Sequence, residues 1–322
     1  MHMLVSLQHV IDLTYSAPIA ECTMDLRLAP RSDGHQTLSD FKFVAGHQAR
    51  VFEYSDWQGN RVHHLSIGCS HDRAIIVVNS HVDIHPQHPE LEQCNDSAPM
   101  SPGTHQHQDY LLPHGPVQFE PRLELFIRET CRNREMRAAQ LLAAIVTQMR
   151  SLVTFNKDAQ DCSECSVVDV LNRGNGDAKD CAHVALALLR YVGIPARYVS
   201  GYLFRRDTTE LELHSWVEAF LPSTGWIGVD PTRGHVIGDE HIALAIGRSE
   251  RDVAPQQGEF RGNAQQVVKL SLRGLDLQVN RNTEWYRTPR PDNERLLELQ
   301  VLEANAETLM RKHGGMNVQS EA

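Results

Sequence analysis

The segment with the clearest chemical potential is Gly176-Asp177-Ala178-Lys179-Asp180-Cys181, a glycine-bounded loop that leads into a helix expected over Ala182–Tyr191. Farther along the chain, His214 lies within one strand pattern and Asp230 ends the next. A small residue entering a helix, then a histidine, then an aspartate is the chain order of a Cys-His-Asp catalytic set. The helix N-terminus would stabilise a thiolate, the histidine would carry the proton, and the aspartate would orient the histidine. Ala178 stands where the sulfur would be.

Three neighbouring residues complete the candidate site. Trp216 lies on the same strand face as His214, because strand residues alternate sides, and is expected to wall the site. Asp180 is expected to cap the helix by accepting backbone N–H bonds, in preference to moving protons. Cys181 lies three residues beyond Ala178, about 60° round the helix, and fits a buried structural cysteine better than an alternative nucleophile.

Two kinds of element must position these residues. Short strand patterns separated by Gly- and Asn-containing turns predict an N-terminal β sandwich, and helical periodicity followed by further strands predicts a helix packed on an antiparallel sheet. The fold class is therefore α+β. The expected domains are a sandwich over 1–95, a Pro/His-rich linker over 96–118, a catalytic core with closing strands (267–272 and 275–279) over 119–290, and a C-terminal helix and tail over 291–322.

Composition narrows the function classes. A net charge of −10 without a basic cluster argues against nucleic acid as a partner. The apolar runs are too short to span a membrane, and the first twenty residues lack a signal-peptide pattern. Seven scattered cysteines suit a reducing compartment, so a cytoplasmic location is expected. Cys162 and Cys165 do not predict a metal site, because no second pair of ligands follows them at metal spacing. Irregularly spaced histidines in and before the linker do not predict one either; these are His81, His85, His88, His105, His107 and His114.

Three ordered motifs carry a family resemblance. The chain reads Gly176-Asp177-Ala178-Lys179-Asp180, then His214-Ser215-Trp216-Val217-Glu218, then Asp230-Pro231-Thr232. These motifs resemble those of the transglutaminase-like superfamily, whose core is a papain-like fold, and the N-terminal region is similar to the β domain that precedes this core in bacterial members. The likeness covers about residues 4 to 280. It implies cysteine-dependent acyl chemistry on a peptide or protein amide without a cofactor, and places the nucleophile at Ala178 and its partners at His214 and Asp230.

The alanine leaves several interpretations open. The resemblance to bacterial members favours a cysteine peptidase or amidase that works through a thioester and is inactive as written. The alternatives are an amine acyltransferase, a natural pseudoenzyme that binds peptides, and a structural module. A deliberate Cys-to-Ala replacement and a natural alanine both fit. The intact His214, Asp230, Trp216 and glycine loop favour the replacement, since a decayed enzyme often loses several catalytic residues. The sequence is also compatible with a homo-oligomer.

Overall fold

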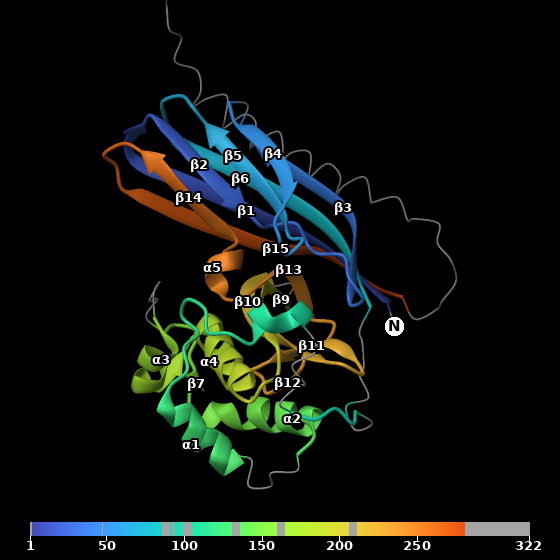
Figure 1. Cartoon of the computed structure of the whole chain (residues 1–322). Helices are drawn as coiled ribbons and strands as arrows, with labels where there is room; N and C mark the ends of the chain where they lie inside the picture. Colours follow the sequence, from blue (N-terminus) through green and yellow to red (C-terminus); the bar gives the residue numbers. More distant parts are fainter. Residues whose placement is uncertain are drawn as a thin grey trace, which may run out of the picture.

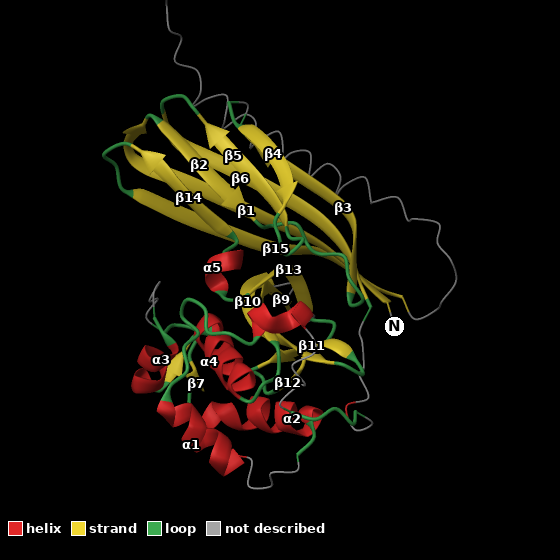
Figure 2. Cartoon of the chain, in the orientation of Figure 1, coloured by secondary structure: helices red, strands yellow, loops and turns green. Residues whose placement is uncertain are grey.

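A computed structural model describes residues 2–46, 48–85, 91, 94–98, 105–130, 136–159, 165–205 and 211–280. They form a two-layered β sandwich that stands over a mixed helix-and-sheet core (Figures 1 and 2). This arrangement confirms the predicted α+β fold class. Within these ranges, no helix is both long and apolar enough to cross a membrane.

The sandwich consists of two four-stranded antiparallel sheets. The first contains, in order, β15 (Gln266–Asn280), β1 (His2–Ile19), β6 (His71–Ile84) and β3 (Gln36–Ala45); the second contains β14 (Gln256–Arg261), β2 (Glu21–Leu26), β5 (Arg61–Ile67) and β4 (Arg50–Ser55). Alternate residues of β1, among them Ile11 and Leu13, face inward and pack against Met24 and Leu65 of the second sheet. This alternation is what makes these segments two-faced strands.

The last two strands correct the predicted domain division. The sequence predicts two closing strands in the core around Arg273-Gly274, but the structure has one strand, β15, which pairs with β1 in the sandwich. The register shifts because Leu7 pairs with Gly274 whereas Ser6 pairs with Asp276, so Leu275 forms a bulge where the sequence suggests a turn. β14 likewise pairs with β2. The sandwich is therefore built from both ends of the described chain.

The core has one five-stranded antiparallel sheet, ordered β12 (His235–Val236), β11 (Gly225–Asp230), β10 (Leu211–Leu221), β9 (Ala196–Phe204) and β13 (His241–Gly247). Its helical elements are η2 (His105–Tyr110), α1 (Pro121–Thr130), α2 (Ala138–Gln148), η3 (Met149–Ser151), α3 (Val167–Arg173), α4 (Ala178–Tyr191) and α5 (Glu250–Val253), with the short parallel pair β7 (Thr154–Phe155) and β8 (Asn175–Gly176). Helix α4 is buried on most sides and packs against β10 and β9. It therefore forms the centre of the core.

A second apolar cluster joins the two bodies. Met3, Val5 and Leu7 of β1 pack with Tyr202 and Phe204 of β9 and with other core-sheet residues. Val82 and Ile84 at the end of β6 join the same cluster, so the ends of both long strands contact the core sheet (Figure 1). The sandwich thus covers part of the core sheet.

Some predictions lie outside the described residues. These are the C-terminal helix and tail over 291–322, part of the linker, and Cys131, Cys162 and His88.

Candidate active site

Helix α4 begins at Ala178, four residues before the predicted start. Its N-cap is Asp177, whose carboxylate Oδ1 accepts a hydrogen bond from the Asp180 N–H at 3.0 Å, while Asp180 Oδ2 accepts from the Asp177 N–H at 3.3 Å. This reciprocal capping box satisfies two of the N–H groups that a helix start leaves unpaired. The structure confirms the prediction that Asp180 accepts a backbone N–H at the helix start, and it adds Asp177 as the N-cap residue itself.

Asp180 also ties the helix to the loop before it. Its carboxylate forms an ion pair with Arg173, at the end of α3. A Cβ on Gly176 would collide with the Asp180 side chain, so this loop needs a glycine next to the cap. Burial and the nearby Asp177 raise the pKa of the Asp180 carboxyl, and Arg173 opposes that rise.

Ala178 occupies the first position of α4 and is half-buried. Helix N–H groups at this end carry a partial positive charge that favours an anion. A methyl group has no atom that can become a nucleophile or form a hydrogen bond. The position thus has the backbone environment of a thiolate site without the thiol.

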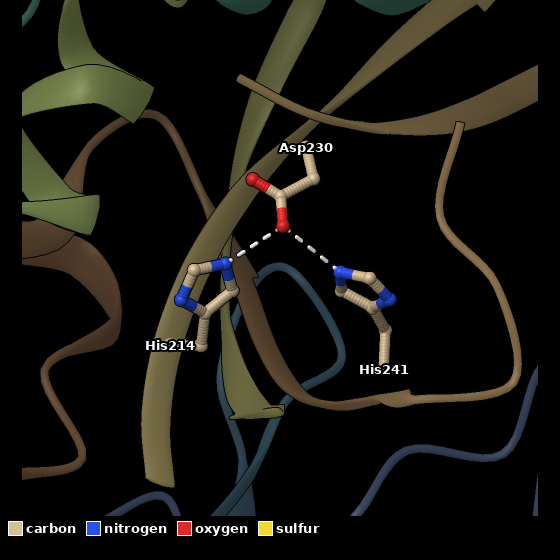
Figure 3. A group of neighbouring side chains, drawn as sticks. All are labelled: His214, Asp230 and His241. Atoms are coloured by element: carbon tan, nitrogen blue, oxygen red, sulfur yellow. Dashed lines mark hydrogen bonds and ion pairs between the residues drawn. The ribbon is translucent and has the colours of Figure 1, made fainter. Parts of the chain in front are cut away.

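His214 and Asp230 form a buried pair. His214 lies on β10 and donates from Nε2 to Asp230 Oδ2 at 2.9 Å, with exposed fractions of 6% and 0% for the two residues. The other ring nitrogen of His214, Nδ1, points away from Asp230 (Figure 3). Since Nε2 carries the proton, Nδ1 of the neutral imidazole is free to accept one.

The residues after Asp230 hold its carboxylate. The Thr232 N–H and hydroxyl donate to Asp230 Oδ1 at 2.8 and 2.7 Å, which explains why a threonine follows the proline in this motif. Burial raises the pKa of the Asp230 carboxyl, but hydrogen bonds from His214 and His241 outweigh burial and hold this pKa well below its usual range. Asp230 is therefore an anion at neutral pH.

His241 belongs to the same group, although the sequence analysis missed it. It begins β13 and donates from Nε2 to the same Asp230 oxygen at 3.1 Å, so that Asp230 lies between the two imidazoles (Figure 3). A histidine at the start of an apolar run, His241-Ile242-Ala243-Leu244, was the available signal. Nothing local in the sequence ties that run to Asp230, because β13 joins the sheet on the far side of β9.

Trp216 packs against one side of the group formed by His214, Asp230 and His241. Its ring stacks near His214, with centroids 6.4 Å apart, and meets His241 edge-on at 5.2 Å. A Cβ on Gly201 would collide with the Trp216 ring and the Ile242 carbonyl oxygen, so the ring is held against the β9 backbone. The structure thus brings together His214, Asp230 and Trp216. Ala178 stands at the start of α4, the helix that packs against the strand bearing His214.

Comparison with known protein families identifies both parts of this architecture. Residues 126–231, which contain Ala178, His214 and Asp230, match the transglutaminase-like superfamily, and residues 5–83 match the bacterial transglutaminase-like N-terminal region. The core of the chain is a transglutaminase-like superfamily domain. The N-terminal match lies within the sandwich and the superfamily match lies within the core.

Individual relatives of this transglutaminase-like protein agree. The uncharacterized protein ML0607 of Mycobacterium leprae is 28% identical over 263 residues, which are 79% of this chain and 92% of the relative. The protein-glutamine gamma-glutamyltransferase of Pseudomonas aeruginosa is 41% identical over 63 residues, only 16% of this chain and 9% of the relative. The crystal structure of a putative cysteine protease from Cytophaga hutchinsonii shares the fold, with a TM-score of 0.70, 21% identity, and coverage of 89% of this chain and 96% of that one.

Cys181 of this transglutaminase-like domain lacks the exposure and the ionisation of a reactive thiol. It is 1% exposed, and its Sγ lies 3.9 Å from the Gly176 carbonyl oxygen. Burial, with the charges of Asp180, Asp177 and Asp230, raises the pKa of its thiol to about 12, so a thiolate does not form at neutral pH.

The other described cysteines and linker histidines lie outside the His214–Asp230 pair. Cys165 is disulfide-bonded, whereas Cys22, Cys69, Cys94 and Cys181 are free thiols. The described linker histidines are dispersed: His107 contacts Phe220, and His114 bonds the Ser249 hydroxyl. Across the described part of the chain, the group of side chains close enough to share a metal ion is His214, Asp230 and His241.

Proposed function

We propose that this protein carries the acyl-transfer site of a cysteine peptidase or amidase, with Ala178 in the nucleophile position. As written, the chain would bind a peptide or protein amide at this site without forming an acyl-enzyme. The observation that carries the proposal is the His214–Asp230 pair, whose Nε2–H bond at 2.9 Å leaves Nδ1 as the basic nitrogen. Such a pair has little purpose without a thiol partner.

With a cysteine at residue 178, the chemistry balances as follows. Nδ1 of His214 takes the thiol proton, and the thiolate attacks the amide carbonyl carbon. The N–H of residue 178 stabilises the oxyanion, and the leaving amine departs with the proton that His214 returns. His214 then takes a proton from water, which attacks the thioester; the acyl group leaves as the carboxylic acid, and the sulfur takes back the proton. Asp230, an anion at neutral pH, stabilises the imidazolium that forms in each half.

An amine in place of that water would make the same site an acyltransferase. The observation in favour of this second function is the short match to the Pseudomonas aeruginosa protein-glutamine gamma-glutamyltransferase. Both functions share the thioester and differ only in the second acceptor, so one variant tests both.

The test is the Ala178→Cys variant. We expect iodoacetamide to alkylate residue 178 at neutral pH faster than it alkylates an ordinary exposed thiol, because the imidazole raises the thiolate fraction. The parent chain reports alkylation of the other cysteines. Ala178→Cys/His214→Ala is the matched control and should lose the enhanced rate by about tenfold or more.

The Ala178→Cys variant also allows amide turnover to be measured. Release of ammonia or of a chromogenic amine from a glutamine or peptide amide indicates hydrolysis, and incorporation of a labelled primary amine indicates transfer. An Ala178→Cys thiol that reacts no faster than its His214→Ala control, with no amide turnover, would contradict the proposal. Reading codon 178 in the source gene separates a replaced cysteine from a natural alanine.

A further inference from the structure

The second histidine on Asp230 has a defined protonation state. His241 is 1% exposed, and its Nδ1 accepts a hydrogen bond from the Gly238 N–H at 3.4 Å. A ring nitrogen that faces an N–H donor cannot itself carry a proton. The proton of the neutral imidazole is therefore on Nε2, where it is donated to Asp230 Oδ2 at 3.1 Å.

Burial favours the neutral form of this imidazole. Burial lowers the pKa of His241, the Asp230 carboxylate opposes this, and His214 and Arg233 add to the lowering. Arg233 lies 3.8 Å from the same Asp230 oxygen and also pairs with Glu240 through its guanidinium. His241 is thus a fixed neutral donor at the pH at which Asp230 is charged.

This tautomer also excludes a different use of the same residues. Two histidines and an aspartate match a common ligand set for a transition metal. A metal on Nε2 of His241 would require Nδ1 to carry the proton and to donate it to an acceptor, as metal-bound histidines do. The group that faces Nδ1 is the Gly238 N–H, a donor. The hydrogen bonds around His241 therefore favour a carboxylate clamp over a metal site.

We propose that His241 is a positioning residue that locks Asp230 so that His214 presents Nδ1 as its basic nitrogen. Thr232 holds one carboxylate oxygen through two donors, and His241 holds the other. The carboxylate cannot then rotate, and His214 must place its Nε2–H on Oδ2. This role rests on the proposed function, but the tautomer of His214 is measurable in the chain as it stands, with Ala178.

Two polar variants and one apolar variant separate positioning from mere packing. His241→Gln places an amide N–H near the position of Nε2 and should still reach Asp230. His241→Asn reproduces only the Nδ1 position and falls short of Asp230, and His241→Leu removes both. His235→Leu, at an exposed histidine on β12, is the control for the loss of an imidazole.

The first readout is the imidazole ¹⁵N spectrum of His214 in the Ala178 chain at neutral pH. We expect the parent, His241→Gln and His235→Leu to show one tautomer with unprotonated Nδ1. His241→Asn and His241→Leu should show shifts moved toward the average of two tautomers. Thermal unfolding of each variant confirms that the spectra come from folded protein.

The second readout is alkylation of the Ala178→Cys variant as a function of pH. Loss of one hydrogen bond to the charged Asp230 carboxylate should slow the reaction about tenfold or more in the Asn and Leu variants, with near-parent rates for Gln. An Ala178→Cys thiol without enhanced reactivity would contradict the proposed function, while the spectra would still decide the role of His241. Folded Asn and Leu variants with the parent tautomer would overturn that role. So would stoichiometric Zn²⁺ binding that shifts the Nε2 resonances of both His214 and His241.

Discussion

Gln36 of the sandwich forms two hydrogen bonds with the backbone of Ala243 in the core sheet. Its Nε2 donates to the Ala243 carbonyl oxygen at 2.9 Å, and its Oε1 accepts from the Ala243 N–H at 2.8 Å. Asn60 makes the same pair of bonds with Ile246, at 2.8 and 2.9 Å. Ala243 and Ile246 lie on β13, an edge strand of the core sheet, so two buried amides stand in for a neighbouring strand.

These side-chain bonds to β13, which we call the amide clamp, predict that the stability of the core depends on the sandwich. Gln36→Leu leaves the buried Ala243 N–H unpaired, while the Ala243 carbonyl keeps the hydrogen bond from the Arg31 N–H, and we expect the unfolding free energy to fall by about 1 to 3 kcal/mol. Urea unfolding of the whole chain measures the change. Gln58→Leu is the control, because that side chain bonds the Asp252 and Tyr110 side chains and not the β13 backbone. An equal loss in both variants would contradict a specific role for the clamp.

A buried histidine in α4 predicts a pH-dependent stability. Burial lowers the pKa of His183 to about 3, and Arg190, Lys179 and Arg251 add to the lowering. Because the unfolded chain binds this proton near pH 6.5 and the folded chain does not, stability should fall as pH drops from 6.5 toward 3. The loss from this group is about 1.4 kcal/mol per pH unit.

The variant His183→Gln isolates that contribution. Its carbonyl oxygen can accept the Glu250 N–H that His183 Nε2 accepts at 3.3 Å, and it does not titrate. We expect urea unfolding at pH 7, 6 and 5 to show a shallower pH dependence in the variant. His9, whose pKa burial lowers to about 4, titrates equally in both proteins and cancels from the difference. Parallel curves would show that His183 is not buried in its neutral form.

The contact between Gly201 and Trp216 predicts a strong effect from a single methyl group. Gly201→Ala would force a Cβ against the buried indole and the Ile242 carbonyl oxygen, neither of which has room to move. We expect a loss of about 3 kcal/mol in unfolding free energy and a changed tryptophan fluorescence. Gly68→Ala, where a Cβ meets no atom within 4 Å, should change stability by less than about 0.5 kcal/mol. Similar stabilities for the two variants would contradict this packing.

Two free cysteines should differ in reactivity. Cys69 is half-exposed and should react with a maleimide at pH 8, whereas Cys181 should react only when the protein unfolds, because it is 1% exposed with a thiol pKa of about 12. Peptide mapping after labelling, with and without urea, measures both. Labelling of Cys181 in the folded protein at the rate of Cys69 would restore it as a candidate nucleophile.

Local signals made much of the site predictable. The glycine loop, the helix that follows and the strand patterns around His214 and Asp230 depend on residues adjacent in the chain. Turn, capping and periodicity rules therefore locate them, although they place the start of α4 four residues late and miss Asp177 as the N-cap. The family motifs are also short and local, which is why the transglutaminase-like core could be identified before any contact was known.

Other features required the tertiary structure because they join segments distant in sequence. β14 and β15 follow the core in sequence but complete the sandwich, because β14 pairs with β2 and β15 pairs with β1. His241 reaches Asp230 only because β13 pairs with β9 on the far side of the sheet. The sequence by itself determined which residue types could perform acyl chemistry and that Ala178 interrupts the set. Only the packing of the sheet decided that Asp230 is shared by two histidines, because hydrogen bonds between distant strands leave no periodic trace along the chain.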